Sequence, residues 1–436
     1  MKSLFSHLFY NQKSWFIFVS FLLVRLIYWI FFPLHLEFDT QRYNQLSDQI
    51  LLGNFDLDTG AFLTAPFVPY FEAFIKVIFG TKWLTAWTLF QIIATAISGI
   101  CIYQMALMLF KKEKMALFAC GIFCFHPSAI LYVNNVGQEC FFQVFLIYSL
   151  FFLIRFLEFN DSIKNLMLSA FFFALCFLTK SYILLWSPCI ALILFFRIKS
   201  TKKAIQYTLI YMILCVLMTM PYGFYNLKKH GIYTLSSNGI EFFFWFGNSE
   251  STYLSDYCIE TYEKRFSEKL PTDTAFFIHS HSLPLSNMTI EKYADILKQM
   301  PPVKERQRYF KEGAKKWISE NRDKWLNLKM FYLKRYILPG LNRHFFVFNR
   351  WLFMLIISVP FYFLAYWGII EAIRKDLKKH FWILSLWVIL LLFCVFFHSE
   401  NRFRSITIEP YFAIYAPIGF QKMIQSLNKI RQFIKL

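Results

Sequence analysis

Long apolar segments recur along this chain, and they constrain its fold more than any other feature. Windows of about 18 or more apolar residues can cross a bilayer as helices. Of the 436 residues, 57% are hydrophobic and 17% are charged, and the mean hydropathy is +0.43. A soluble protein of this size has no need of so much apolar surface, so the sequence predicts an all-α polytopic membrane protein with about ten spans. The predicted spans are roughly 14–34, 83–110, 115–133, 139–158, 165–179, 181–197, 205–223, 351–371, 381–398 and 407–423.

Basic residues predict the orientation of these spans, because lysine and arginine concentrate in cytoplasmic loops. If the N-terminus is inside, the inner loops hold KKEK (111–114), RIKSTKK (197–203) and RKDLKK (374–379), while the short outer loops are poorer in basic residues. The net charge of +19 therefore fits membrane topology without a nucleic-acid partner. We expect an integral protein of a bacterial inner membrane with both termini in the cytoplasm.

This orientation divides the chain into three regions. Residues 1–223 form a module of about seven spans, with a first outer loop at 35–82. Residues 224–350 are too long and too polar for a connector, and we expect a mostly helical or mixed extracytoplasmic domain there. Residues 351–436 add about three spans and a cytoplasmic tail. Apolar residues at helical spacing predict helices over 304–337, which would lie on the membrane surface or pack on the first loop.

The first outer loop begins with the polar stretch FDTQRYNQLSDQILLGNF. A helix over 38–52 would carry Asp39, Arg42 and Tyr43 on one face and would end at Gly53. The prolines at 66 and 69 predict a further short helix, which we expect to be interfacial. Asp39 is either a solvated acid at a helix start or a member of a site.

Further charged residues occur at other outer ends of the predicted spans. Glu139 begins the fourth span, where an acid is either a boundary charge or part of a site, and Lys180 lies between the fifth and sixth spans. Arg402 and Arg404 face outward against the inward bias, which favours either a bound phosphate or lipid headgroups. Carboxylates and cations on one side suit a reaction in which a carboxylate deprotonates an acceptor hydroxyl and cations stabilise a phosphate leaving group.

At these positions the chain resembles the GT-C membrane glycosyltransferases, in the branch of protein O-mannosyltransferases and the bacterial aminoarabinose transferase. The resemblance covers most of the chain, in order. It departs from the family at Lys180 and Tyr225, where arginine is usual, and at Thr40, where the eukaryotic protein mannosyltransferases have a second acid. The matching motifs are Asp39, Tyr43 and Gly53; Pro66 and Pro69; His126, Pro127 and Glu139; Pro221, Asn226 and SSNG; Gly247 and Asn248; and Arg402, Arg404 and Pro410.

The resemblance implies a sugar transferase that uses a polyprenyl-phosphate sugar donor, works on the extracytoplasmic face and usually inverts the anomeric carbon. The acceptor would be a lipid, a glycan or a protein. From its position a few residues beyond the first span, Asp39 is predicted to be the general base, and Glu139 is the alternative base or a residue that orients the donor or acceptor. The residues expected to bind substrate are Arg42, Tyr43, Lys180, Asn226, Asn248, Arg402 and Arg404.

Several alternatives stay open at this level. A transporter or flippase of a lipid-linked substrate would also place charges at the outer face, and so would a membrane scaffold that binds a partner. No cofactor is predicted. A divalent metal is left open, because one Asp and one Glu in separate loops could share a cation, although no compact carboxylate cluster demands one. Arg25 inside the first span would face the bundle interior or reach the interface. Asn248 follows the aromatic run EFFFWF and lies either in a turn after a buried strand or in a substrate-side loop.

Overall fold

The computed structural model describes residues 9, 12–32, 39–59, 62–159, 162–253, 301–338 and 348–434. These residues form helices joined by short loops, as the sequence predicts. The helices that build the bundle and its outer side are α2 (Gln12–Phe31), α3 (Asp39–Leu51), α4 (Phe67–Phe79), α5 (Trp83–Phe110), α6 (Glu113–Phe125), α7 (Pro127–Leu131), α8 (Gln138–Phe159), α9 (Ile163–Thr179), η3 (Ser181–Trp186), α10 (Ser187–Arg197), α11 (Thr201–His230), α12 (Ile240–Phe246), α13 (Glu250–Thr252), α17 (Val303–Glu320), α18 (Arg322–Ile337), α19 (Phe348–Lys375), α20 (Leu377–Phe396), α21 (Asn401–Thr407) and α22 (Glu409–Ile434).

Six stretches of helix among the described residues are long and apolar enough to cross a membrane, so the chain is an integral membrane protein. Each of the ten predicted spans overlaps a helix, but the count of ten stays a prediction. The third predicted span, 115–133, is wrong as a continuous helix. Residue His126 is extended and Pro127 begins a new short helix, because proline disfavours helical backbone in the residue before it. The six stretches are Gln12–Phe31, Phe67–Phe110, Gln138–Phe159, Thr201–His230, Leu355–Lys375 and Leu377–Phe396.

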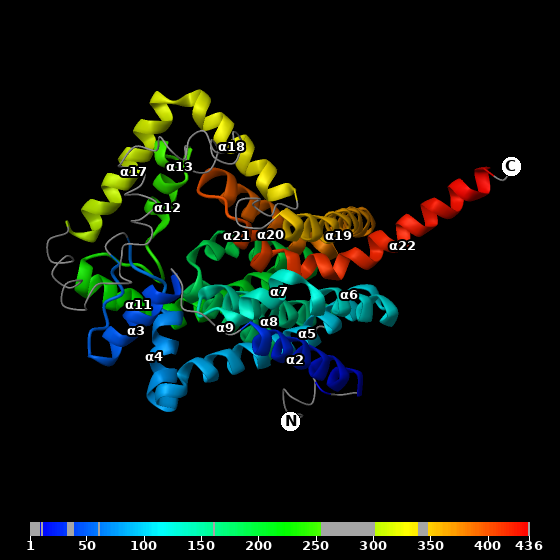
Figure 1. The fold of residues 1–436 in the computed structure, drawn as a ribbon, viewed down its shortest axis with the longest axis horizontal. Helices are drawn as coiled ribbons and strands as arrows, with labels where there is room; N and C mark the ends of the chain where they lie inside the picture. The colour runs from blue at the N-terminus through cyan, green and yellow to red at the C-terminus, as the bar shows by residue number, and fades with distance from the viewer. Residues whose placement is uncertain are drawn as a thin grey trace.

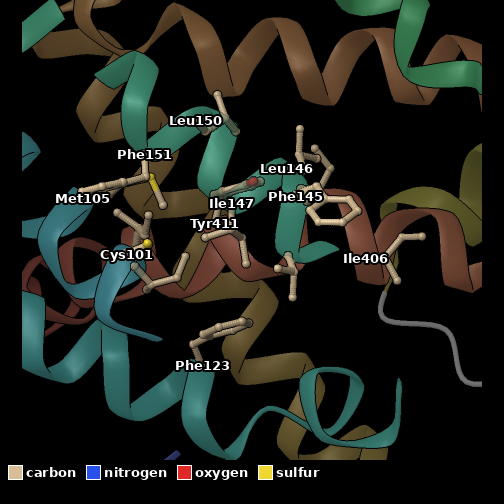
Figure 2. Close-up of a cluster of buried hydrophobic side chains, with 14 of the residues drawn as sticks. Cys101, Met105, Phe123, Phe145, Leu146, Ile147, Leu150, Phe151, Ile406 and Tyr411 are labelled. Atoms are coloured by element: carbon tan, nitrogen blue, oxygen red, sulfur yellow. The ribbon is translucent and has the colours of Figure 1, made fainter. Parts of the chain in front are cut away.

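The helices pack as a bundle, and α12, α13, α17 and α18 form a cap on one side of it (Figure 1). In the bundle α5 contacts α2, α6 and α8, while α8 contacts α9 and α9 contacts α11. Side chains from α5, α6, α8, α21 and α22 meet in the buried core that Figure 2 shows. Figure 1 shows α17 and α18 with α12 beneath them, on the side of the molecule away from α2. This arrangement leaves the ends of α8, α9 and α20 on the side that carries the cap.

The first outer loop forms the two helices predicted for it. Helix α3 spans Asp39–Leu51, and Gly53 follows with a φ of +87°, a conformation that glycine adopts without strain. Helix α4 starts directly after Pro66. The loop then packs against α17, where Arg306 forms an ion pair with Asp58. Of the two predicted positions for residues 304–337, packing on the first loop is therefore confirmed for α17.

A buried arginine stabilises the break between α6 and α7. Arg25 on α2 is fully buried, and its guanidinium lies 4.4 Å from the ring centroid of Phe21. Its Nη1 donates to the carbonyl of Cys124 at 3.3 Å, and its Nη2 lies 3.5 Å from the carbonyl of Ala129. These carbonyls flank the Pro127 break, where the helical hydrogen bonds stop. Arg25 therefore faces the bundle interior, the first of the two predicted placements, and supplies donors that lipid cannot.

Helices α19 and α22 touch backbone to backbone. A Cβ atom on Gly368 would lie 2.0 Å from the carbonyl oxygen of Tyr415, and one on Gly419 would lie 2.0 Å from that of Leu364. Helix association in lipid depends on such close packing, because lipid removes the hydrophobic drive between helices. The contact therefore requires glycine at both positions.

We expect Gly368→Ala to push α19 and α22 apart and to lower the thermal unfolding midpoint in detergent. The free energy of unfolding should fall by about 1–3 kcal/mol, the usual range for overpacking. Gly121→Ala is the matched control, because a Cβ on Gly121 meets no atom within 4 Å. Equal midpoints for the two variants, measured by tryptophan fluorescence, would show that the close contact does not stabilise the bundle.

Helix α18 is joined to α12 and α20 by buried polar contacts. The Nζ of Lys329 donates to the carbonyl of Gly247 at 2.9 Å. Trp325 Nε1 donates to Asn248 Oδ1 at 2.9 Å, and Asn248 Nδ2 donates to the carbonyl of Phe396 at 2.9 Å. Lys329 is only 5% exposed, and this burial lowers its pKa to about 7. A Cβ on Gly247 would lie 1.2 Å from the carbonyl oxygen of Phe397, so only glycine fits this junction.

The buried lysine predicts a pH dependence of stability. An unfolded lysine titrates near 10.4, so protonation at Lys329 penalises the folded state fully below pH 7, and the penalty is relieved as pH rises toward 10. The stability of the wild type relative to Lys329→Met should therefore increase between pH 7 and pH 10. Lys334→Met, on an exposed lysine of the same helix, is the control. A constant difference between wild type and Lys329→Met across this range would contradict the assignment.

Candidate active site

Three chain segments bring opposite charges together at one end of the bundle. Glu139 lies in the first turn of α8, Lys180 ends α9, and Arg402 lies on α21. Glu139 Oε1 is 2.9 Å from Lys180 Nζ and 3.6 Å from Arg402 Nη1. Arg402 also pairs with Glu400. We call these four residues, Glu139, Lys180, Glu400 and Arg402, the mouth cluster.

The local backbone explains the positions of Glu139 and Lys180. A carboxylate in the first turn of α8 is favoured by the partial positive charge of the helix N-terminus. A Cβ on Gly137 would lie 2.8 Å from Glu139 Oε2, so the loop before α8 gives this carboxylate its room. Lys180 is extended (φ −142°, ψ 114°) and turns the chain from α9 into η3. Its cation is favoured near the carbonyls that end α9.

Hydrogen bonds fix α21 beside these two residues. The hydroxyls of Tyr132 and Ser405 are 2.8 Å apart, and those of Tyr182 and Thr407 are also 2.8 Å apart. Gln143 Nε2 donates to the carbonyl of Ser405 at 3.3 Å. Because these contacts come from the loop before α8, from η3 and from α8 itself, they hold Arg402 in register with Glu139 and Lys180.

Two residues of this region were not predicted from the sequence. Glu400 Oε1 accepts from Arg402 Nη2 at 3.3 Å and lies 2.9 Å from His398 Nε2. Burial acts to raise the pKa of Glu400, but the Arg402 guanidinium and the His398 hydrogen bond hold it well below its usual value. The signal was the alternation of charge in HSENRFR, which places an acid two residues before Arg402.

Arg404 lies apart from the mouth cluster in its contacts. Its Nη1 donates to the carbonyls of Arg335, Tyr336 and Leu338 at 2.9, 2.7 and 2.6 Å. Its Nε is 3.2 Å from Glu409 Oε1. The side chain is only 3% exposed. These contacts satisfy the carbonyl groups at the end of α18, so Arg404 connects the cap to the bundle.

The two predicted asparagines are also buried among backbone groups. Asn248 is fully buried, and its amide bridges the end of α12, α18 and the end of α20. Asn226 on α11 donates to the carbonyl of Thr234 at 3.2 Å. The run EFFFWF before Asn248 is helix α12, so the alternative of a turn after a strand is wrong.

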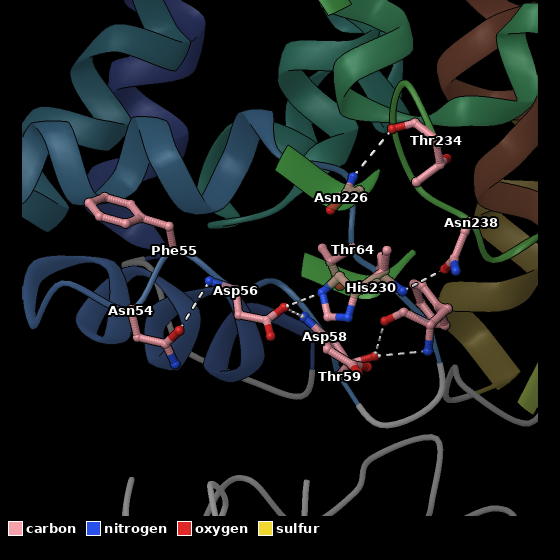
Figure 3. A network of polar contacts seen from close by, with 12 residues as sticks. Asn54, Phe55, Asp56, Asp58, Thr59, Thr64, Asn226, His230, Thr234 and Asn238 are labelled. Atoms are coloured by element: carbon pink, nitrogen blue, oxygen red, sulfur yellow. Dashed lines mark hydrogen bonds and ion pairs between the residues drawn. The ribbon is translucent and has the colours of Figure 1, made fainter. Parts of the chain in front are cut away.

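Residues of the first loop contact the end of α11 and the segment that follows it. Asp56 Oδ1 is 2.9 Å from His230 Nε2, and the backbone N–H of Leu63 donates to Asn238 Oδ1 at 2.6 Å (Figure 3). On α3, Arg42 lies with its guanidinium 5.2 Å from the ring centroid of Tyr43. Asp39 is the first residue of α3, and its side chain lies outside the described residues.

The mouth cluster can bind an anion and can orient a hydroxyl. Lys180 and Arg402 supply charged donors, and Glu139 supplies an acceptor between them. Glu139 and Lys180 are 6% and 9% exposed, so their charges act in surroundings where electrostatic interactions are stronger than in water. Among the described residues, no three His, Cys, Asp or Glu side chains lie together as metal ligands.

Comparisons with known proteins agree with this picture of the bundle. Residues 64–224 match the family model described as dolichyl-phosphate-mannose-protein mannosyltransferase. No curated protein matches the chain. The matched segment runs from the middle of the first loop, just before α4, through most of α11, and it contains Glu139 and Lys180.

Solved structures of an archaeal enzyme share the fold. The chain resembles the oligosaccharyltransferase AglB of Archaeoglobus fulgidus in complex with an inhibitory peptide and a dolichol-phosphate, with a TM-score of 0.52 and 12% identity. It resembles the apo form of the Archaeoglobus fulgidus oligosaccharyltransferase with a TM-score of 0.53 and 12% identity. In both comparisons 97% of this chain is covered, but the chain spans only about half (52%) of the archaeal protein.

At this identity the archaeal structures establish the fold alone, and that fold is GT-C-like, as the sequence motifs imply. The family match covers the segment in which Pro127, Glu139 and Pro221 carry the resemblance described from the sequence. Residues 64–224 are thus similar to the dolichyl-phosphate-mannose-protein mannosyltransferase family, and the chain as a whole has a fold similar to that of the archaeal oligosaccharyltransferase.

Proposed function

We propose that this protein transfers a sugar from a polyprenyl-phosphate donor to an acceptor hydroxyl at the extracytoplasmic face of a bacterial inner membrane. The observation that carries the proposal is the mouth cluster. Lys180 and Arg402 both lie within 3.6 Å of Glu139 at one end of the bundle, although at least 41 residues separate the three in sequence. A lipid phosphate held at a membrane surface would meet these cations at the depth where its headgroup lies.

The reaction is a single displacement at the anomeric carbon. The acceptor oxygen forms a bond to that carbon while the bond between the carbon and the phosphate oxygen breaks, with inversion. The hydroxyl proton passes to a carboxylate, and the polyprenyl phosphate leaves with an additional negative charge. Lys180 and Arg402 would stabilise that charge, because charge-assisted hydrogen bonds to phosphate oxygens are strong and gain strength away from water.

The family match supports a lipid-phosphate donor, since the family is described by dolichyl-phosphate-mannose. One of the archaeal structures with this fold is a complex with a dolichol-phosphate. The acceptor stays open among a lipid, a glycan and a protein. Arg42 and Tyr43 on α3 are proposed to line the acceptor side. Asn226, Asn248 and Arg404 would act on the substrates through the backbone segments that they hold.

Transfer is tested directly with purified protein in detergent and a polyprenyl-phosphate sugar that is radiolabelled in the sugar. Movement of label into an acceptor, or slow release of free sugar, supports the proposal. Transbilayer movement of the intact donor in proteoliposomes, without cleavage of the sugar–phosphate bond, would favour a flippase and contradict it.

Arg402→Ala should weaken donor binding. Loss of a charge-assisted hydrogen bond of about 1.5–3 kcal/mol raises the donor KM by about 10- to 150-fold. Arg402→Lys keeps the charge but loses the planar fork, and it should recover only part of the loss. An unchanged KM in Arg402→Ala protein that is folded, as judged by its thermal unfolding midpoint, would make Arg402 a boundary charge.

Asp39→Asn should lower turnover with little change in donor KM, if Asp39 is the general base. The substitution keeps the size of the side chain and removes its basicity, and the expected loss is about 10²- to 10⁴-fold in kcat. Glu139→Gln provides the comparison. Near-normal turnover in Asp39→Asn beside inactive Glu139→Gln would assign the base to Glu139, and normal turnover in both would remove the carboxylate mechanism.

A further inference from the structure

Glu400 holds one edge of the Arg402 guanidinium. Its Oε1 accepts from Nη2 at 3.3 Å, and its Oε2 pairs with Nε. The remaining nitrogen, Nη1, is the one that lies 3.6 Å from Glu139. A guanidinium can bind two partners along different edges at once. The contact with Glu400 therefore turns the Nη1 edge toward Glu139 and Lys180.

Glu400 is itself held in place by His398. The imidazole Nε2 is 2.9 Å from Glu400 Oε1, and the ring is only 3% exposed. The His398 ring packs against Phe246 on α12, with ring centroids 4.3 Å apart, and lies edge-on to Tyr332 on α18, at 6.1 Å. Cap residues therefore hold the His398 ring in place, and the ring in turn holds Glu400 through its hydrogen bond.

The backbone around Glu400 is tied down from both sides. Asn248 Nδ2 donates to the carbonyl of Phe396 at 2.9 Å, just before the segment. Arg335 Nη1 donates to the carbonyl of Ser399 at 2.7 Å, within it. The donors come from the cap, and the acceptors belong to the turn that leads from α20 into α21. The position of Arg402 therefore also depends on Asn248 and Arg335, which lie outside the mouth cluster and hold the backbone that precedes it.

A long arginine side chain loses up to about 2 kcal/mol of rotamer freedom when a ligand immobilises it. A side chain that is already fixed before binding avoids this cost, which is the general benefit of preorganisation. Arg402 is 35% exposed at the side chain, so burial alone does not fix its rotamer.

We propose that Glu400 is a positioning residue, oriented by His398, that presets the Nη1 edge of Arg402 for the phosphate of the lipid-linked donor. The inference rests on the proposed function, because it concerns the same phosphate. It assigns roles to two residues that do not themselves meet the substrates. It also distinguishes Glu400 from Glu139, whose carboxylate lies between the two cations.

The opposite role for Glu400 is a competing anion. A carboxylate beside Arg402 repels a phosphate, so its removal would then tighten donor binding. The two roles predict donor KM changes of opposite sign, which makes them separable by measurement.

The test is a double-mutant cycle on Glu400 and Arg402, with donor KM and kcat measured for each variant. We expect Glu400→Ala to raise the donor KM by about tenfold, the effect of one net hydrogen bond to a charged group, and to change kcat much less. Glu400→Gln keeps an acceptor oxygen and should restore part of the loss. In the Arg402→Ala background, Glu400→Ala should add little, because the residue through which it acts is gone.

Two further variants sharpen the cycle. His398→Phe keeps the ring packing and removes the hydrogen bond to Glu400, so it should raise the donor KM in the same direction but less. Glu312→Ala removes an exposed carboxylate of the cap that pairs with Arg308 at 2.8 Å, and it should leave KM and kcat unchanged. Binding of polyprenyl phosphate itself, measured as a shift of the thermal unfolding midpoint, gives a readout that does not need an acceptor.

The outcomes separate this inference from the function on which it rests. Wild type that transfers sugar, with Glu400→Ala showing an unchanged or lower donor KM, would overturn the positioning role alone. Fully additive effects of Glu400→Ala and Arg402→Ala would overturn it as well. Wild type that neither binds polyprenyl phosphate nor cleaves its sugar ester would overturn the proposed function, and the role of Glu400 would fall with it.

Discussion

A backbone carbonyl that ends a buried helix has no water to bind, and this constraint explains several of the buried polar contacts of the protein. Three buried helix ends among the described residues receive a donor from elsewhere in the chain. Arg25 serves the break after α6, Lys329 serves the end of α12, and Arg404 serves the end of α18. Because a missing partner leaves a buried polar group unsatisfied, these donors determine which segments lie together.

The same constraint separates two arginines that look equivalent in sequence. Arg402 and Arg404 are two residues apart on α21, so they project from different faces of the helix. Arg404 points to the end of α18, where it donates hydrogen bonds to backbone carbonyls and forms an ion pair with Glu409. Arg402 points to Glu139 and Glu400 and keeps part of its surface exposed. One face of this short helix thus holds the fold together, and the other carries the charge of the mouth cluster.

Hydropathy and punctuation residues were enough to predict most of the helices, because lipid demands long apolar helices and proline or glycine ends them. Helix α3, the start of α4 after Pro66 and the turn at Lys180 all follow these local rules. Such rules are weaker for short apolar runs, where helix and strand patterns are alike. The run at 241–246 shows this, since it forms α12 although its aromatic residues also suit a strand.

The candidate site was only partly predictable, for a physical reason. Sequence order and topology assigned Glu139, Lys180 and Arg402 to one side of the membrane, but pairing between them depends on how α8, α9 and α21 pack. Local sequence says nothing of the 2.9 Å contact between Glu139 and Lys180. Burial of Lys329 and the orientation of Glu400 were equally out of reach, since both depend on the cap.

The cap and the mouth cluster therefore depend on each other. Helix α18 supplies three donors: Trp325 to the side chain of Asn248, Lys329 to the carbonyl of Gly247 after α12, and Arg335 to the carbonyl of Ser399 after α20. The end of α20 leads into the turn that carries His398 and Glu400. A change on α18 that loosens this turn would reach Arg402 without touching it, since each step is a direct hydrogen bond or ring contact. Outer helices of this kind thus do more than cover a membrane bundle: their donors set the geometry of the charges at its mouth.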